Sequence, residues 1–410
     1  MIRACNPTTA VQDSWTDDGM TSTPKPDSRV RVLLVTEDLD YGGAERQVVE
    51  LANSLDQDRF DVHVCSLSDY VPLGSKLRDR DHRLHIIKPR NKFDLSIILR
   101  LARLLRALRI DVVHGYLYTA DVVCRAAGRL ARTQAIIGSE RSAFYHAPRR
   151  EFLGLKFTRR WVDLIIANSQ AGAKYNGSLY HRPASDYRVV HNGVDTERFR
   201  PADATAMRQT LKLAEHDLVI GAFANFRPAK NHEMLFRAFR LVLDSFPKAR
   251  LLLVGDRPIQ SKGALDDYIA HLQRIVDDLQ IRDRCIFVGH HEDPELLYPV
   301  CHISALSSRY EGTANVLLES MACGVPFVAT NVSDNEYLSR QGDVGRLVPV
   351  GDEAGMAHHM ECLLGDAALR NEMGRKARQW VVSEFSNSRL AEKVAAVYLE
   401  ALHRDMKRPN

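Results

Sequence analysis

SSRYEGTANVLLESMACGVPFVAT, residues 307 to 330, is the stretch that decides the fold. It predicts a loop carrying Glu311, an apolar helix of about ten residues and a β-branched strand that ends at Thr330. Gly324 and Pro326 stand between helix and strand, where they would end the helix. This loop, helix and strand order is typical of an α/β domain with a parallel sheet.

The predicted helix start favours an anion site. The Thr313 hydroxyl is suited to capping the helix, and the backbone N–H groups of Ala314, Asn315 and Val316 would then have no preceding carbonyl to bind. Free amides and the positive end of the helix dipole together favour a phosphate. We therefore expect a phosphate group to bind here.

Two carboxylates flank this start, Glu311 just before the helix and Glu319 about one turn inside it. Carboxylates accept hydrogen bonds from sugar hydroxyls, so a ligand with both hydroxyls and phosphates, such as a nucleotide sugar, would suit the stretch. An ordinary βα unit with one surface glutamate and one helix glutamate fits the spacing equally well.

The spacing of Glu311 and Glu319 resembles the E-x7-E signature of retaining glycosyltransferases of family GT4. Further blocks resemble that family in the family's own order, over about residues 30 to 400: YGGAER from Tyr41, DVVH from Asp111, IIANS from Ile165, HNGVD from His191, RPAKNH from Arg227 and LLVGD from Leu252. The resemblance implies the GT-B fold, an α/β architecture of two Rossmann-like domains that face an interdomain cleft.

Size and composition fit a soluble globular protein of two domains. The 410 residues exceed one typical core, and 45% hydrophobic with 26% charged residues is ordinary for a globular protein. A net charge of +4 gives no reason to expect nucleic acid. The seven cysteines form no C-x-x-C pair, and the N-terminus has no secretory pattern, so we expect a reducing cytoplasmic setting without disulfides.

In the first half, residues 1–28 are polar and predicted to be disordered, and 29–199 form the acceptor domain. A buried strand leads to Gly42 and Gly43. Because glycine has no side chain, the backbone of this loop could come close to a ligand or adopt a positive φ. The G-x-G-x-x-G spacing of a dinucleotide site is missing, which disfavours an oxidoreductase. Asp38-Leu39-Asp40 fits the D-x-D motif of the other large class of glycosyltransferases, and we interpret this as a chance match. In the family, the glycine loop approaches the donor phosphate and the acceptor.

The resemblance also implies that His114, at the end of a short strand, faces the donor sugar. The segment from Ser139 to Arg160 gathers basic and aromatic residues, which would suit an anionic, lipid-linked acceptor at a membrane surface or an ordinary solvated helix. The arginine-rich helix predicted from Phe93 to Arg109 fits the edge of a sheet better than a membrane surface.

The second half is predicted to be the donor domain, 200–384, followed by a segment, 385–410, whose helix crosses back to the first domain. Arg227 and Lys230 would neutralise a diphosphate, and in the family the matching residues grip the donor pyrophosphate. The usual glycine before that arginine is replaced by Asn225 and Phe226. The resemblance places the nucleobase against the backbone of Val288 and Gly289. Gly312 is also predicted to bind the substrate.

We therefore expect a glycosyltransferase that moves a sugar from a nucleoside-diphosphate sugar to a glycan or lipid-linked acceptor, with retention. Such enzymes serve polysaccharide and cell-envelope synthesis, in the cytoplasm or peripherally at the inner face of the membrane. No metal or other cofactor is expected, because cations and a helix terminus can stabilise the leaving phosphate. A GT-B isomerase or hydrolase and an inactive nucleotide-sugar binding subunit are the alternatives.

Overall fold

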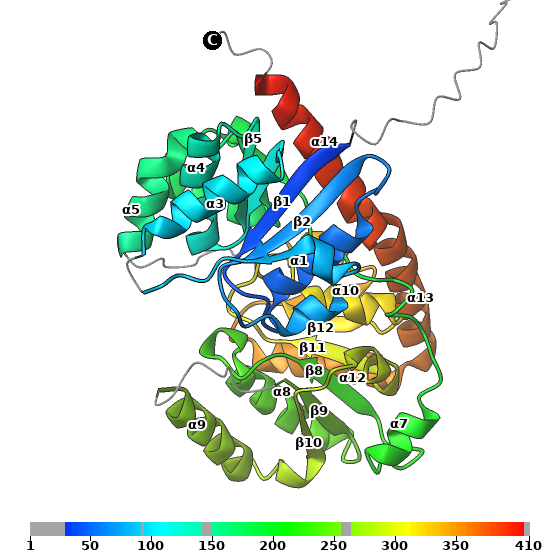
Figure 1. Cartoon of the computed structure of the whole chain (residues 1–410). Helices are drawn as coiled ribbons and strands as arrows, with labels where there is room; N and C mark the ends of the chain where they lie inside the picture. The colour runs from blue at the N-terminus through cyan, green and yellow to red at the C-terminus, as the bar shows by residue number, and fades with distance from the viewer. Residues whose placement is uncertain (1–28, 92–93, 142–148, 256–263, 406–410) are drawn as a thin grey trace, which may run out of the picture.

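A computed structural model describes residues 29–91, 94–141, 149–255 and 264–405 (Figure 1). The first half contains a parallel sheet in the order β3-β2-β1-β4-β5-β6-β7. Its strands are β1 (Val30–Thr36), β2 (Phe60–Ser66), β3 (Leu84–Ile86), β4 (Val112–Gly115), β5 (Ala135–Glu140), β6 (Leu164–Ala167) and β7 (Tyr187–Val189). Its helices are α1 (Gly43–Ser54), α2 (Arg80–Arg83), α3 (Ser96–Ala107), α4 (Tyr118–Ala131), α5 (Arg149–Thr158) and α6 (Gln170–Leu179).

The second half contains another parallel sheet, in the order β10-β9-β8-β11-β12-β13. Its strands are β8 (Val219–Phe223), β9 (Arg250–Val254), β10 (Cys285–Gly289), β11 (Ile303–Leu306), β12 (Phe327–Thr330) and β13 (Gly345–Val348). Its helices are α7 (Thr205–Thr210), α8 (His232–Ser245), α9 (Ala264–Asp278), α10 (Asn315–Ala322), α11 (Asn335–Leu338), α12 (Glu353–Gly365) and α13 (Ala367–Glu384), and α14 (Asn387–Asp405) follows.

Both sheets are buried on their two faces by apolar clusters, which explains why their strands are nearly continuous apolar runs. The strand order reverses beside the first strand of each sheet, β1 and β8. Ligands of open α/β sheets bind at such reversals, beyond the carboxyl ends of the strands. The glycine loop follows β1 and the Arg227 loop follows β8, so both loops lie at reversal points.

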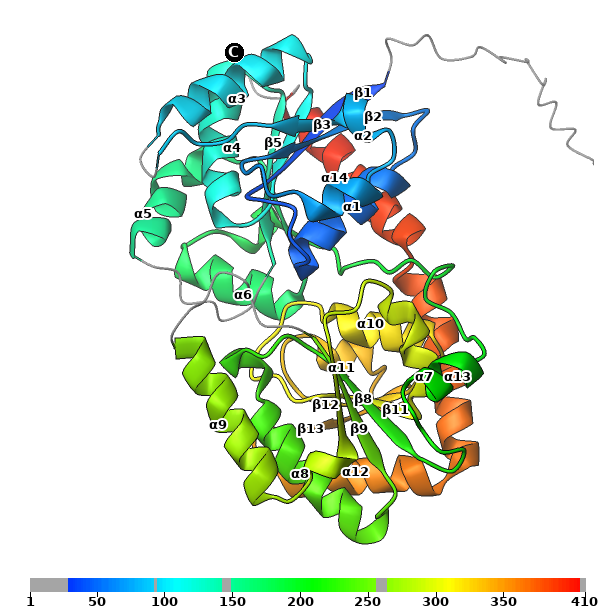
Figure 2. The same ribbon diagram turned by 60° about the horizontal axis from the view of Figure 1, so that its bottom comes forward.

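The chain crosses between the halves twice, and the crossings pair with each other. The backbone N–H of Val194 donates to the Phe385 carbonyl at 2.8 Å, and that of Asn387 donates to the Val194 carbonyl at 3.0 Å. Beyond the second crossing, α14 runs back along the first sheet (Figure 2) and buries Leu390, Val394 and Tyr398 in that domain's core.

The predicted α/β class with two facing Rossmann-like domains is confirmed. Helix α3 buries Ile97, Leu101 and Leu105 against the first sheet, as the edge-of-sheet interpretation requires. Within the described ranges, each helix is either too short or too polar to cross a bilayer.

Candidate active site

A cavity of about 400 Å³ lies between the two domains and is lined by both. Most of the predicted site residues line it: Gly42, Gly43, Arg227, Lys230, Glu311, Gly312, Thr313, Ala314, Asn315 and Glu319. The central stretch therefore folds into the wall of an interdomain cleft.

Three predicted site residues lie elsewhere. Val288 is not part of this wall, and Gly289 lines a smaller, mainly apolar pocket that also contains Phe226 and Phe287. His114 is fully buried and is not one of the residues that line the cavity. Its Nδ1 lies 2.7 Å from the Tyr398 hydroxyl and its Nε2 2.6 Å from Ser139 Oγ, so both ring nitrogens are already occupied. In this conformation His114 does not reach a ligand in the cleft.

The helix start differs from the prediction in one respect. Helix α10 begins at Asn315, its N-cap is Ala314, and no side chain caps it. The capping prediction for Thr313 is therefore wrong, because its hydroxyl donates to the backbone carbonyl of Asn168 in the other domain. Among the described residues, no acceptor is found for the backbone N–H groups of Asn315 and Val316. Those amides remain free to bind an anion.

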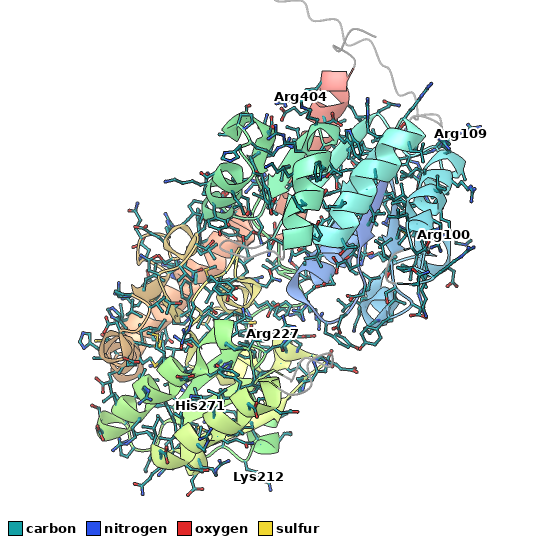
Figure 3. All side chains as sticks on the ribbon, turned by 90° about the vertical axis from the view of Figure 1, so that its left-hand side faces the viewer. Arg100, Arg109, Lys212, Arg227, His271 and Arg404 are labelled. Atoms are coloured by element: carbon teal, nitrogen blue, oxygen red, sulfur yellow. The ribbon has the colours of Figure 1, made fainter. Side chains whose placement is uncertain are left out.

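Glu311 is held by two donors on one oxygen. Lys230 Nζ and Ser308 Oγ each lie 2.6 Å from Glu311 Oε1. Arg227 is exposed on the side of the second domain that faces the first (Figure 3), and it forms no ion pair with any described residue. The wall thus presents one neutralised lysine and one uncompensated arginine.

Glu319 is held from both domains. Its Oε1 lies 2.5 Å from Nη1 of Arg46 on helix α1, and its Oε2 accepts a hydrogen bond of 2.8 Å from the Tyr298 hydroxyl. The Glu319 side chain is only 6% exposed. The carboxylate is therefore fixed in orientation, which suits the recognition of a polar ligand group.

One face of α1 makes this interdomain contact. Gln47 exchanges two hydrogen bonds with Gly193 of the first crossing, at 2.8 and 2.9 Å. The Gly43 carbonyl accepts from Asn315 Nδ2 at 3.2 Å, four residues before Glu319 on α10. Gly42 has an extended backbone with φ −83°, which any residue can adopt. Glycine is needed there because the Glu45 side chain packs against its Cα: a Cβ would lie 1.9 Å from Glu45 Oε2.

Gly312 lies where the two domains approach each other closely. A Cβ at this position would lie 2.4 Å from Asn168 Oδ1 and 2.7 Å from the Arg141 carbonyl, which real side chains do not tolerate. Glycine is thus required here for the domains to meet.

The cavity is also lined by residues that were not predicted as site residues, among them Arg46, Arg141, Asn168 and Asn192. Arg46, Asn168 and Asn192 belong to the motif blocks quoted above, so these blocks could have identified them as site residues. Arg141 lies within the basic segment from Ser139 to Arg160, of which residues 142–148 and the side chains of 149–152 lie outside the described structure.

We found no cluster of three or more His, Cys, Asp or Glu side chains suited to a metal ion in the part of the chain that the structure describes. The prediction of metal-independent activity is not tested by this observation and remains a prediction.

Comparisons with known proteins agree with this geometry. Residues 41–198 match the model described as Glycosyltransferase Family 4, and residues 217–366 match that of Glycosyl transferases group 1. The chain belongs to this family of glycosyltransferases.

Two curated relatives and one solved structure illustrate the similarity. The chain is 26% identical over 319 residues to N-acetyl-alpha-D-glucosaminyl L-malate synthase of Bacillus anthracis, covering 76% of this chain and 81% of that protein. It is 22% identical over 379 residues to UDP-Gal:alpha-D-GlcNAc-diphosphoundecaprenol alpha-1,3-galactosyltransferase of Escherichia coli, covering 87% and 94%. The crystal structure of Anabaena HepE in complex with UDP-glucose superposes with a TM-score of 0.81 at 21% identity, covering 91% and 100%.

Proposed function

We propose that this protein transfers a sugar from a nucleoside-diphosphate sugar to a glycan or lipid-linked saccharide, with retention of anomeric configuration. The observation that carries the proposal is the wall of the cavity, where Arg227, Lys230 and the free amides of α10 converge. These groups would stabilise negative charge developing on the departing diphosphate, which is the largest electrostatic contribution available to such a reaction. No metal ion is needed in this scheme.

The carboxylates take binding roles in the proposal. Glu319, fixed by Arg46 and Tyr298, would accept hydrogen bonds from the ribose, and Glu311 would hold the transferred sugar. Glu311 is a poor candidate for a covalent nucleophile because one of its oxygens already accepts from both Lys230 and Ser308. The leaving phosphate would instead take the proton of the acceptor hydroxyl on the face from which it departs.

The named relatives support a nucleotide-sugar donor and a diphosphate-linked acceptor, since one of them carries a UDP-sugar and a diphosphoundecaprenol acceptor in its name. The neighbour crystallised with UDP-glucose has the same fold. Neither comparison identifies the donor base or sugar of this chain.

The test is a mass-spectrometric assay of UDP-, GDP- and ADP-sugars with the purified chain, with and without a cell lipid extract. We expect one donor class to be consumed only when extract is present, with an α-linked product from an α-linked donor by NMR. Lys230→Met should lower turnover by about 10²–10³, and Lys248→Met, which changes an exposed lysine outside the cavity, should leave it near the wild-type rate. Donor consumption without extract would instead establish an isomerase or hydrolase, and donor binding without turnover an inactive binding subunit.

A further inference from the structure

The cavity contains more positive than negative side chains. Four cations line it, namely Arg46, Arg141, Arg227 and Lys230, against two carboxylates, Glu311 and Glu319. Arg46 and Lys230 are each paired with one of those carboxylates. Arg141 and Arg227, which come from different domains, therefore have no carboxylate partner among the described residues.

The hydrogen-bond partners that the described residues offer to the Arg141 side chain are neutral. Its Nη1 donates to Asn192 Oδ1 and its Nη2 to Ser139 Oγ, both at 3.3 Å, and its guanidinium lies 4.4 Å from the centre of the Tyr116 ring. No described carboxylate pairs with it. A partly buried cation without a counter-ion is costly, so its place in a ligand cavity indicates that a ligand supplies the charge.

Arg141 is also held rigidly. Its backbone carbonyl accepts from Asn168 Nδ2 at 3.2 Å, and Ser139 in turn hydrogen-bonds the buried His114, whose other nitrogen meets Tyr398 of α14. Burial, reinforced by the charge of Arg141, holds the pKa of His114 well below its usual value, so the imidazole is neutral. His114 thus supports Arg141 from below and does not compete with it for an anion.

Its location separates Arg141 from the donor groups. Arg227, Lys230 and the α10 amides all belong to the second domain, whereas Arg141 follows β5 of the first domain. Asn192 bridges the two sides, accepting from Arg141 and donating to Asn315 Oδ1 at 2.6 Å. An anion on Arg141 would therefore lie beside the donor phosphates without replacing them.

We propose that Arg141 binds an oxyanion of the acceptor, a phosphate or carboxylate carried close to the hydroxyl that receives the sugar, and that it selects anionic over neutral acceptors. This inference rests on the proposed function, and it assigns the acceptor class that the motifs leave open.

Inorganic phosphate and acetate serve as probes, titrated into the chain after saturation with the nucleoside diphosphate that binds it. We expect phosphate, acetate or both to bind at one further site, at least tenfold more weakly in Arg141→Gln and to an intermediate degree in Arg141→Lys. Arg103→Gln is the matched control, because it removes an exposed arginine of α3 outside the cavity. Equal binding by wild type and Arg141→Gln, or no second anion site, overturns the inference.

Acceptor kinetics provide an independent reading. N-acetylglucosamine, its 1-phosphate and glucuronic acid compare a neutral, a phosphorylated and a carboxylated sugar. Wild type should favour one of the charged pair through a lower KM, and Arg141→Gln should lose that preference while its nucleotide affinity stays within twofold of wild type. A comparable loss of nucleotide affinity would reassign Arg141 to the donor. Absence of any nucleotide binding would count against the proposed function itself, so the two failures are distinguishable.

Discussion

Arg46 of the first domain lies 2.5 Å from Glu319 of the second, although 273 residues separate them in sequence. The contact joins helix α1, which follows the glycine loop, to helix α10, which lines the proposed nucleotide-binding site. A ribose that binds Glu319 would therefore meet a carboxylate whose position depends on the other domain. The Arg46–Glu319 ion pair would therefore contribute both to the contact between the domains and to nucleotide binding.

Replacing Arg46 by Met should weaken donor binding. Loss of a hydrogen bond to a charged group costs about 1.5–3 kcal/mol, so we expect the donor KM to rise about tenfold or more. In a Glu319→Gln background the same substitution should have a much smaller effect, because the partner charge is already absent. Fully additive effects of the two substitutions on donor KM would contradict the coupling.

Gly312→Ala should separate the domains locally. The new methyl group would overlap Asn168 and the Arg141 carbonyl, so we expect kcat/KM to fall by about tenfold to a hundredfold while the chain still folds. Gly351→Ala is not a suitable control because of its positive φ, whereas Gly365→Ala changes a glycine whose Cβ meets nothing closer than 3.5 Å. Steady-state kinetics of both variants provide the check, and near-normal turnover in Gly312→Ala would show that the approach is not required.

Lys230→Ala and Glu311→Gln should each lower kcat by about 10²–10³, the typical cost of removing one preorganised charge-stabilising group. Their thermal unfolding midpoints should stay close to that of wild type, since both side chains line a cavity and lie outside the core. Rapid-quench measurement of a single turnover checks the chemical step directly. Normal rates in both variants would refute the assigned roles.

Glu45 should make stability depend on pH. Burial raises its pKa from 4.5 to about 7, with the carboxylates of Asp38 and Asp40 adding to the shift. The folded state then binds more protons than the unfolded state between about pH 4.5 and pH 7, so stability falls as pH rises through this window. The loss is on the order of 3 kcal/mol. Glu45→Gln should remove this component, and unfolding midpoints of wild type and variant that change in parallel from pH 4 to pH 8 would contradict it.

Chelation should leave turnover unchanged. Because Arg227, Lys230 and the α10 amides are proposed to stabilise the leaving diphosphate, the rate in excess EDTA should match the rate in added Mg²⁺. Loss of activity in EDTA that Mg²⁺ or Mn²⁺ restores would refute the metal-independent scheme.

The sequence predicted the parts of the fold that depend on local patterns. Apolar runs such as Val30–Thr36 identified buried parallel strands, and the spacing from Glu311 to Glu319 placed both carboxylates in one cavity. Local rules failed at Thr313, whose hydroxyl suits a helix cap but finds its partner 145 residues away, at Asn168. Long-range contacts of this kind depend on how the two domains meet, which no periodicity encodes.

The burial of His114 also could not be predicted from local sequence patterns. Its position at the end of β4 is where ligands of α/β sheets commonly bind, yet α14 returns from the second domain and covers it with Tyr398. The sequence predicted that the final helix would cross back, but the residue it would cover depends on packing in three dimensions.

The most direct test is an isothermal titration of UDP, GDP, ADP and CMP against wild type and Glu319→Gln, without added metal. We expect one nucleoside diphosphate to bind the wild type with one-to-one stoichiometry and to bind Glu319→Gln at least tenfold more weakly. Failure of all four nucleotides to bind, or equal affinity in the two proteins, would contradict the assignment of this cleft as a nucleotide-sugar site.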